Sequence, residues 1–354
     1  MIKVGICGFA HGHVFSYAGE WMNDPEKYNV IVTAAWDHDE KRLYESIQKF
    51  PGEIKAYTSL DEMLDSDIDA VVVSSETGYH ADICVKAANK KKNIVLYKPM
   101  ALNMKEADRI VNAVKENGVR LSMGWQMRND PQNIRMREIA QDEELGKVLA
   151  FRRRHGLPTH VWDNFENTWH VNPKHNRDIF ADDSAHPINM MLWMFGMPKT
   201  VMCELSTMLN EKIPNDNGVA LFKYENGLIA EISCSFTTSA SEITTEMYCE
   251  KGSVQQYFGD NPATRLKKPE GMCGLKWFKE GDSDWTDSGI ETPASHGLRL
   301  RDQAGPLAEF LNGGKEVCTA EEGRDSLRLV LACYLSNELG QRVDVNDQRI
   351  NDIE

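Results

Sequence analysis

The feature that most constrains the fold is a regular alternation of short apolar runs and amphipathic segments over the first 124 residues. The apolar runs occupy 3–7, 30–36, 70–75, 93–98 and 119–125, and helical periodicity occupies 12–22, 39–49, 79–90 and 103–117. Strands that are apolar throughout are buried on both faces, and the intervening helices supply that cover. The alternation therefore predicts βαβ units and a doubly wound parallel sheet. The helix over 103–117 is expected to end at Gly118 and to bury Ala107, Ile110, Val111 and Val114.

The order of expected strands and helices changes after residue 125. A strand is expected over 147–155, and helices are expected over 131–141, 184–195, 299–312 and 320–338. Residues 199–257 alternate in the manner of antiparallel strands, with Asn226-Gly227 as a hairpin turn, whereas 259–297 have the composition of a loop. Residues 125–354 are thus predicted to form an α+β domain with a large, mainly antiparallel sheet.

Composition excludes several classes of protein. A length of 354 residues suits two domains, and a formal net charge of -14 without a basic stripe argues against a nucleic-acid partner. No apolar run reaches the roughly 18 residues of a membrane span, and the residues after Met1 lack the pattern of a signal peptide. The eight cysteines contain no Cys-x-x-Cys pair, so we expect reduced, mostly buried thiols and a cytoplasmic protein.

The loop after the first predicted strand reads GFAHGH, residues 8–13. A loop at this place presents backbone N–H groups and a helix N-terminus to an anion, the arrangement that binds the pyrophosphate of a dinucleotide. Gly8 suits a tight turn and Ala10 is small, but the third glycine of G-x-G-x-x-G is displaced, with Gly12 beside His13. The loop alone is therefore a weak signal.

Asp37 strengthens the dinucleotide interpretation. It ends the second predicted strand, where a carboxylate accepts hydrogen bonds from ribose hydroxyls and repels a 2′-phosphate. Residues 1–124 are therefore predicted to form a dinucleotide-binding Rossmann domain that prefers NAD. Arg42 nearby leaves NADP use open.

Two further positions carry side chains suited to proton transfer. Lys98 and Pro99 follow the fifth predicted strand, at the carboxyl edge where open α/β sheets bind ligands. Asp182 and His186 lie four residues apart and share a face if one helix begins by residue 182. A carboxylate beside a histidine orients the ring and raises its basicity. An exposed lysine, an N-cap aspartate and a structural histidine are the ordinary alternatives.

Taken in order, three blocks of the chain resemble the Gfo/Idh/MocA oxidoreductases, the family of glucose–fructose oxidoreductase and inositol dehydrogenase. Residues 71–108 parallel its V-V-V-x-T-P-x-x-x-H and E-K-P-x-A motifs. Residues 124–148 parallel G-x-x-x-R-x-x-P and L-G-K-V, and 182–198 parallel D-x-x-x-H-x-x-D-x-x-x-W-x-x-G-x-P. The resemblance covers essentially the whole chain and implies a Rossmann domain followed by a substrate-binding domain.

The resemblance also assigns roles to individual residues. It implies that Lys98 contacts substrate and nicotinamide, that Asp182 holds substrate hydroxyls and that His186 is the acid/base. Arg128 matches the arginine of the segment that links the domains, and His155 and Trp169 are candidates to line the substrate cleft between them. The expected cofactor-lining residues are Gly8, Phe9, Ala10, His11, Gly12, His13, Asp37, Ser75, His80, Lys98 and Gln126.

The chain departs from the family motifs at several of these positions. Tyr97 replaces the glutamate of E-K-P, Ser75-Glu76-Thr77 replace T-P-N, and Asn189 replaces the last aspartate of D-x-x-x-H-x-x-D. These substitutions leave the substrate open, while the order of the blocks supports the fold.

We therefore expect an NAD(P)-dependent dehydrogenase or reductase that acts on a hydroxyl or carbonyl of a sugar, polyol or related cyclic alcohol. One alternative is transient oxidation that enables elimination or glycoside cleavage, and another is a non-catalytic, cofactor-bound sensor of the same fold. A metal site is a further alternative, because His11, His13 and His80 cluster at one predicted sheet edge and five histidines lie between 155 and 186. No H-E-x-x-H or paired-cysteine spacing supports it, so we expect no metal. The second domain's sheet is expected to pair subunits into a homodimer or homotetramer.

Overall fold

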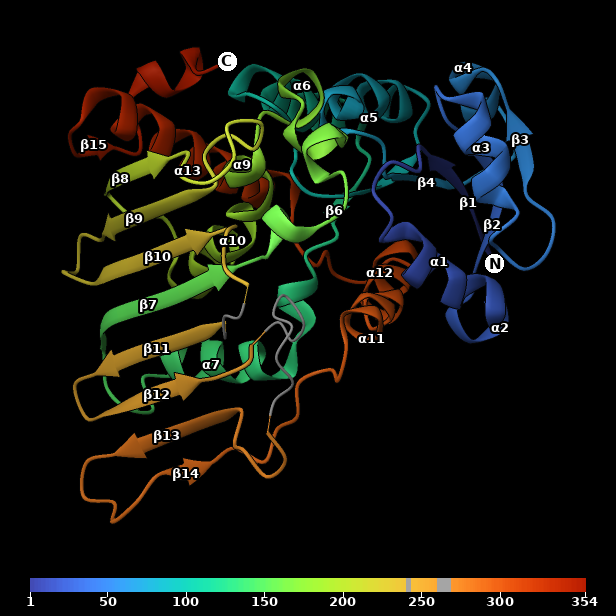
Figure 1. Ribbon diagram of the computed structural model, residues 1–354. Helices are drawn as coiled ribbons and strands as arrows, with labels where there is room; N and C mark the ends of the chain where they lie inside the picture. Colours follow the sequence, from blue (N-terminus) through green and yellow to red (C-terminus); the bar gives the residue numbers. More distant parts are fainter. Residues whose placement is uncertain (240–242, 260–268) are drawn as a thin grey trace. The chain divides into compact units, whose positions relative to one another are not determined.

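A computed structural model describes residues 1–239, 243–259 and 269–354 of the protein (Figure 1). The chain forms two compact units, each assembled from several segments. Unit 1 combines residues 1–129, 174–176 and 297–327, and unit 2 combines 130–173, 177–296 and 328–354. Residues 297–327, far beyond the predicted division at 124/125, are thus part of unit 1.

The sheet of unit 1 has six strands in the order β3-β2-β1-β4-β5-β6. Its strands are β1 (Ile2–Cys7), β2 (Val30–Trp36), β3 (Lys55–Tyr57), β4 (Ala70–Val73), β5 (Asn93–Leu96) and β6 (Leu121–Met123). Every neighbouring pair is parallel. The chain order reverses beside β1, between β2 and β4, and open sheets of this kind bind ligands at the carboxyl ends of the strands flanking such a reversal. The predicted doubly wound sheet is confirmed, and β3 is a short strand that the sequence pattern missed.

Helices cover both faces of this sheet. Figure 1 shows α5 (His80–Asn89) and α6 (Met104–Asn117) on one side and α1 (Val14–Asn23) and α12 (Ala304–Leu311) on the other. The remaining helices of the unit are α2 (Pro25–Tyr28), α3 (Glu40–Ile47), α4 (Leu60–Leu64), α11 (His296–Arg301, whose first residue is grouped with unit 2), η1 (Thr77–Tyr79) and η2 (Gln126–Asn129). Trp21 of α1 donates its indole N–H to Ala304 O at 2.9 Å, which ties α12 to the Rossmann core.

Helix α6 shows how local sequence sets these elements. The Asn103 side chain accepts from the Glu106 N–H at the N-cap, and Gly118 adopts φ 64° at the C-cap as predicted. The buried face is Met104, Ala107, Ile110 and Ala113. The expectation was wrong for Val111 and Val114, which are only half-buried. The face of α6 that packs on the sheet is the one that carries Met104.

Unit 2 is built on a nine-stranded sheet in the order β14-β13-β12-β11-β7-β10-β9-β8-β15. Its strands are β7 (Val148–Gly156), β8 (Thr200–Ser206), β9 (Asn217–Lys223), β10 (Ile229–Ser235), β11 (Thr244–Cys249), β12 (Gly252–Gln256), β13 (Leu275–Lys279), β14 (Thr286–Asp287) and β15 (Val343–Asp344). Neighbours are antiparallel except β7 and β10, which run parallel. The predicted large, mainly antiparallel sheet is confirmed, and Tyr224 N donates to Leu228 O across the predicted Asn226-Gly227 hairpin.

The loop predicted over 259–297 is wrong in part, because β13 and β14 lie within it and extend the sheet; residues 260–268 of that loop fall outside the described residues. Their strand signal is weak, since β13 has only five residues and its sequence LKWFK does not keep a strict alternation. In Figure 1, α7 (Pro131–Gln141) and α10 (Ala185–Phe195) lie against one face of the sheet. The burial pattern agrees: Ala220 and Phe222 of β9 are buried, whereas Val219 and Leu221, which alternate with them, are exposed.

Short helices complete unit 2. They are η3 (Thr159–Val161), η4 (Phe165–Asn167), η5 (Trp169–Val171), α9 (Ile179–Asp183) and η6 (Gln348–Asp352), while α8 (Pro173–Asn176) and α13 (Ala320–Leu339) each contribute residues to both units. Six of the eight cysteines are buried, as expected. Over the described ranges 1–239, 243–259 and 269–354, no helix has both the length and the apolar character needed to cross a membrane.

Candidate functional site

The loop between β1 and α1 depends on a glycine at position 8. Gly8 has φ +86°, and a Cβ added there would lie 2.6 Å from Ser75 Cα, so a larger residue would be strained and would also collide with the backbone after β4. Gly8 N donates to Trp36 O at 2.7 Å, which closes the loop over the end of β2. An added Cβ at Gly12, in contrast, would meet no atom within 4 Å among the described residues. Packing therefore does not require the glycine at position 12, whereas it does at position 8.

The loop leads directly into the N-terminus of α1. This helix has ten residues, its first turn is uncharged, and the side chain of the preceding His13 does not cap it. Its positive end is therefore turned to the loop formed by Gly8, Phe9, Ala10, His11 and Gly12. A negatively charged pyrophosphate fits such a place.

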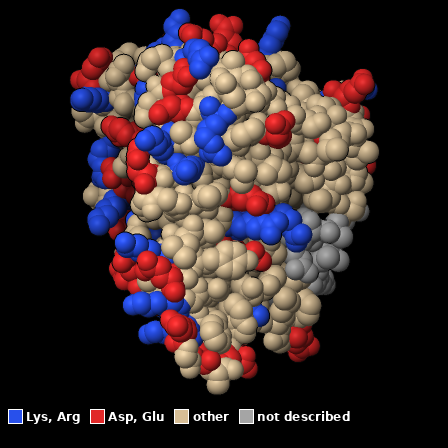
Figure 2. All heavy atoms as spheres, turned by 90° about the vertical axis from the view of Figure 1, so that its left-hand side faces the viewer, with Lys and Arg blue, Asp and Glu red and all other residues tan. Residues whose placement is uncertain are grey.

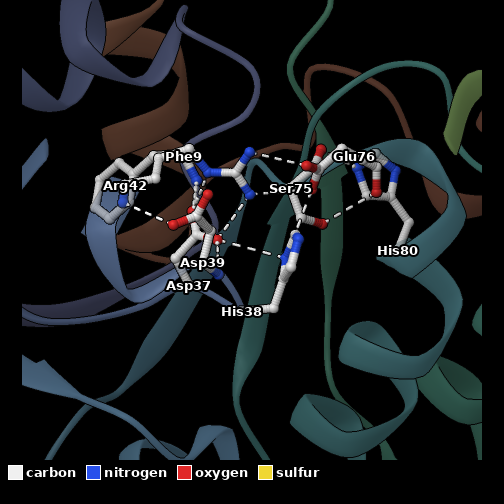
Figure 3. Close-up of polar contacts among 8 residues, drawn as sticks. All are labelled: Phe9, Asp37, His38, Asp39, Arg42, Ser75, Glu76 and His80. Atoms are coloured by element: carbon white, nitrogen blue, oxygen red, sulfur yellow. Dashed lines mark hydrogen bonds and ion pairs between the residues drawn. The ribbon is translucent and has the colours of Figure 1, made fainter. Parts of the chain in front are cut away.

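Asp37 lies at the end of β2 and is 2% exposed. Its Oδ2 accepts from Phe9 N at 2.8 Å, and its Oδ1 accepts from Asp39 N at 2.9 Å. The carboxylate is thereby fixed beside the dinucleotide loop, as Figure 3 shows. The end of β2, the turn at Gly8 and the N-terminus of α1 together fit a bound dinucleotide.

His80, an expected cofactor-lining residue, is buried at the start of α5. Its Nε2 lies 3.1 Å from Ser75 O, and its Nδ1 lies 2.9 Å from Pro99 O. Burial lowers the pKa of His80 against the opposing effect of these carbonyl groups, so the ring stays neutral. A neutral ring carries one N–H, so His80 donates to one of these two carbonyls while it lies between the segment after β4 and the segment after β5.

Lys98 follows β5 and is 3% exposed, and the peptide bond between Lys98 and Pro99 is cis. The preceding Tyr97 is fully buried, and its hydroxyl lies 3.0 Å from both His13 Nδ1 and Gln303 Nε2. The His11 ring lies 4.4 Å from the Tyr97 ring, centroid to centroid. Burial raises the pKa of Tyr97, so its hydroxyl stays protonated. The two unusual histidines of the loop are thus packed on the tyrosine that replaces the family's glutamate.

Gln126 and Arg128 lie in η2 and are buried. Arg128 Nη1 donates to Glu322 Oε2 at 2.9 Å and to Val317 O at 3.1 Å, so this expected substrate-binding arginine is held by an acidic partner within unit 1. A substrate role for Arg128 stays a prediction.

The expected catalytic residues of unit 2 belong to two helices rather than one. Asp182 lies on α9 and His186 on α10, because Ser184 separates the two helices. The condition for a shared face, one helix that begins by residue 182, is therefore not met, and the helix expected over 184–195 is α10. His186 Nε2 lies 3.9 Å from Asp183 Oδ1, whereas Asp182 Oδ2 lies 3.1 Å from His170 Nδ1.

Asp183 is a residue that the sequence analysis missed. Its Oδ2 lies 2.7 Å from Nε2 of His155 on β7, so one carboxylate stands beside both His155 and His186. The expected Trp169 stacks on His170 with ring centroids 4.0 Å apart. The adjacent pair Asp182-Asp183 was a visible signal, but the break at Ser184 decides which carboxylate meets which ring. The cluster combines carboxylates with histidines, as proton transfer at a hydroxyl requires.

Metal binding has little support in this geometry. Among residues 1–239, 243–259 and 269–354, no three His, Cys, Asp or Glu side chains come together as a metal site would need. His11 and His13 do meet, with ring centroids 4.3 Å apart, but edge to face.

Comparisons with known proteins agree with this arrangement. Residues 2–125 match the family described as "Oxidoreductase family, NAD-binding Rossmann fold", and residues 134–255 match the "GFO/IDH/MocA C-terminal domain". A 1,5-anhydro-D-fructose reductase of Ensifer adhaerens is 25% identical over 82% of this chain and 84% of its own length. A myo-inositol 2-dehydrogenase of Thermotoga maritima is 27% identical over 73% of this chain and 75% of its own.

Among solved structures, a levoglucosan dehydrogenase in complex with NADH and levoglucosan superposes with a TM-score of 0.82 at 17% identity, over 98% of this chain and 100% of the other. At that identity the likeness concerns the fold, whereas the two family matches concern the sequence itself and fall in both predicted domains. The chain therefore belongs to the Gfo/Idh/MocA family of NAD-binding oxidoreductases.

Proposed function

We propose that this oxidoreductase interconverts a hydroxyl and a carbonyl group on a sugar, a polyol or a related cyclic alcohol. The observation that carries the proposal is the cluster of Asp182, Asp183 and His186 on α9 and α10, which supplies carboxylates and a proton acceptor together. The relatives named above act on inositol, anhydrofructose and levoglucosan, all of which carry ring hydroxyls.

The cofactor, when bound, accepts or returns the hydride. Gly8, the N-terminus of α1 and Asp37 would hold it in unit 1, through the pyrophosphate and a ribose respectively. His186 would take the proton from the substrate hydroxyl during oxidation and give it back during reduction. Asp182 would accept hydrogen bonds from neighbouring hydroxyls, and the ammonium group of Lys98 would donate to the reacting oxygen.

The direct test is a substrate screen with the purified protein. Inositols, anhydrohexoses and free sugars are supplied with NAD+, and NADH is followed by absorbance; the corresponding ketones are supplied with NADH. A substrate that yields NADH in the wild type and not in His186→Gln supports the proposal. Release of an aglycone from a glycoside without net NADH would instead indicate transient oxidation, and NAD+ binding without turnover of any substrate would indicate a sensor.

We propose, further, a cytoplasmic homodimer or homotetramer that pairs through the open face of the nine-stranded sheet. That face presents Val219, Ile229 and Tyr248, each between 42% and 49% exposed. Figure 2 shows one side of the protein, on which uncharged residues predominate and charged side chains form separate groups. Exposed apolar side chains interspersed with charged ones, here the Arg152–Glu231 pair, are compatible with a subunit contact.

Light scattering behind a sizing column checks this assembly. The expected mass is two or four times the 40.1 kDa of the chain. Val219→Lys, which places a charge on the open face, should shift the mass toward one chain, whereas Lys41→Glu on α3 of unit 1 should leave it unchanged. A wild type that elutes as a single chain at micromolar concentration would contradict the proposal.

A further inference from the structure

Arg42 is held between two carboxylates beside the dinucleotide loop. It projects from α3 toward Asp37 at the end of β2 and Glu76 after β4, as Figure 3 shows. Its Nε and Nη2 donate to the two oxygens of Asp37, both at 2.7 Å. Its Nη1 and Nη2 donate to Glu76 at 2.8 and 3.2 Å. The Asp37 side chain is fully buried and that of Glu76 is 7% exposed, so this ion triplet is largely screened from water.

The carboxylate of Asp37 is saturated in this arrangement. A carboxylate offers about four lone-pair positions, and Asp37 receives four donors: the backbone N–H groups of Phe9 and Asp39 and two N–H groups of Arg42. The backbone donors are fixed by the loop and by the start of α3. Ribose hydroxyls can therefore reach Asp37 only by taking the two positions that Arg42 occupies.

Glu76 offers Arg42 a second carboxylate when it leaves the first. The guanidinium already donates two bonds to Glu76, so it can give up Asp37 and remain paired. Two carboxylates against one guanidinium leave one net negative charge at this place. His38, whose Nδ1 lies 3.4 Å from Asp37 Oδ1 and 3.7 Å from Glu76 Oε2, is the only other titratable group among the described residues of Figure 3 that faces both.

We propose that Glu76 is the positioning residue that makes this enzyme select NAD over NADP. Glu76 retains Arg42 after the ribose has displaced it from Asp37, and so prevents the guanidinium from pairing with a 2′-phosphate. An arginine near the end of the second strand is by itself the residue that would accommodate that phosphate. In this protein the guanidinium of Arg42 is already paired with Glu76 before a cofactor binds.

Calorimetric titration of the protein with NAD+ and with NADP+, in the absence of substrate, tests the proposal. In Glu76→Gln we expect the Kd for NADP+ to fall by roughly tenfold, because the freed guanidinium pairs with the phosphate. The Kd for NAD+ should not fall, because NAD+ carries no 2′-phosphate to receive the guanidinium that its ribose displaces from Asp37. A merely structural role of Glu76 would weaken both cofactors together.

Two further variants keep the test decisive. Glu45→Gln removes an equal charge from α3, the helix that carries Arg42. Glu45 forms only an exposed pair with Lys41, so this variant should leave the ratio of the two Kd values unchanged. Adding Arg42→Ala to Glu76→Gln should abolish the gain for NADP+. If Glu76→Gln does not fold, Glu76→Asp, which shortens the reach to Arg42, should shift the ratio in the same direction by less. An unchanged ratio in a folded Glu76 variant, or a gain that survives without Arg42, overturns the proposal. The readout is binding alone, so it stands or falls separately from the proposed substrate.

Discussion

The two charged clusters of this protein are built differently. In unit 1, the carboxylates Asp37 and Glu76 are paired with Arg42, a cation that keeps its charge at every pH a protein meets. In unit 2, the carboxylates Asp182 and Asp183 are paired with His170 and His155, whose charge depends on a proton. A cluster with fixed charge suits recognition of a charged cofactor, and a cluster with conditional charge suits proton transfer. Variants in unit 1 should therefore act on cofactor binding, and variants in unit 2 on turnover.

The largest effect is expected from a variant that disrupts only the charged cluster of unit 2. His186→Gln should lower kcat by about 10²- to 10⁴-fold, because it removes the group that exchanges the substrate proton. Steady-state kinetics with the substrate found in the screen gives the loss, and calorimetry gives the Kd for NAD+, which should not change. A His186→Gln enzyme with wild-type kcat would show that another residue is the acid/base.

Gly8→Ala disrupts the dinucleotide loop of unit 1. The added Cβ would lie 2.6 Å from Ser75 Cα at a backbone φ of +86°. We expect a cost of about 2–4 kcal/mol, divided between the free energy of unfolding and NAD+ binding. Chemical denaturation with and without NAD+ measures both parts. The matched control is Gly12→Ala, where the added methyl group meets open space and the φ of Gly12 is not in the left-handed region. Equal losses in the two variants would contradict the assigned role of Gly8.

Asp183→Asn sharpens the contrast between neighbours in unit 2. The variant removes the carboxylate shared by His155 and His186, and kcat should fall by about tenfold to a hundredfold, the value of a lost charge-assisted hydrogen bond. Asp182→Asn, the matched neighbour on α9, should chiefly raise the substrate KM. Comparing kcat and KM of the two variants checks the assignment, and a reversal of the two effects would exchange the roles of Asp182 and Asp183.

The smallest expected effect is a pH dependence of stability that arises from His80. Burial lowers its pKa, so below about pH 6.5 the unfolded chain takes up a proton that the folded chain does not. The free energy of unfolding contributed by His80 is therefore present above that pH and is lost as the pH falls. His80→Gln should be less stable than the wild type by about 1 kcal/mol at pH 7.5, and the gap should narrow at pH 5.5. Urea denaturation at the two pH values measures it, and a gap that widens in acid would contradict the neutral ring.

Much of the fold could be predicted from the sequence because its signals are local. The apolar runs of 30–36 and 93–98 became β2 and β5, helix 131–141 was confirmed as α7, and the Asn226-Gly227 turn joins β9 to β10. The short elements β3, β13 and β14 were missed, since two to five residues give too few positions for a periodic pattern to stand out. The assignment of 297–327 to unit 1 was missed for another reason, because apolar periodicity shows that a helix is buried but not against what.

The sequence by itself determined the parallel sheet, the dinucleotide loop at Gly8 and the acid at the end of β2, because each depends on the order of residues within a few turns of chain. Only the tertiary structure decided which charges meet. Arg42 reaches Glu76, 34 residues further along the chain, because β2 and β4 flank β1 and end at the same edge of the sheet. Asp183 rather than Asp182 faces His155 because the helix is interrupted at Ser184 and β7 lies beneath α9 and α10 in the same unit. Pairing across a sheet is set by strand order and helix register, which are long-range properties that no local pattern encodes.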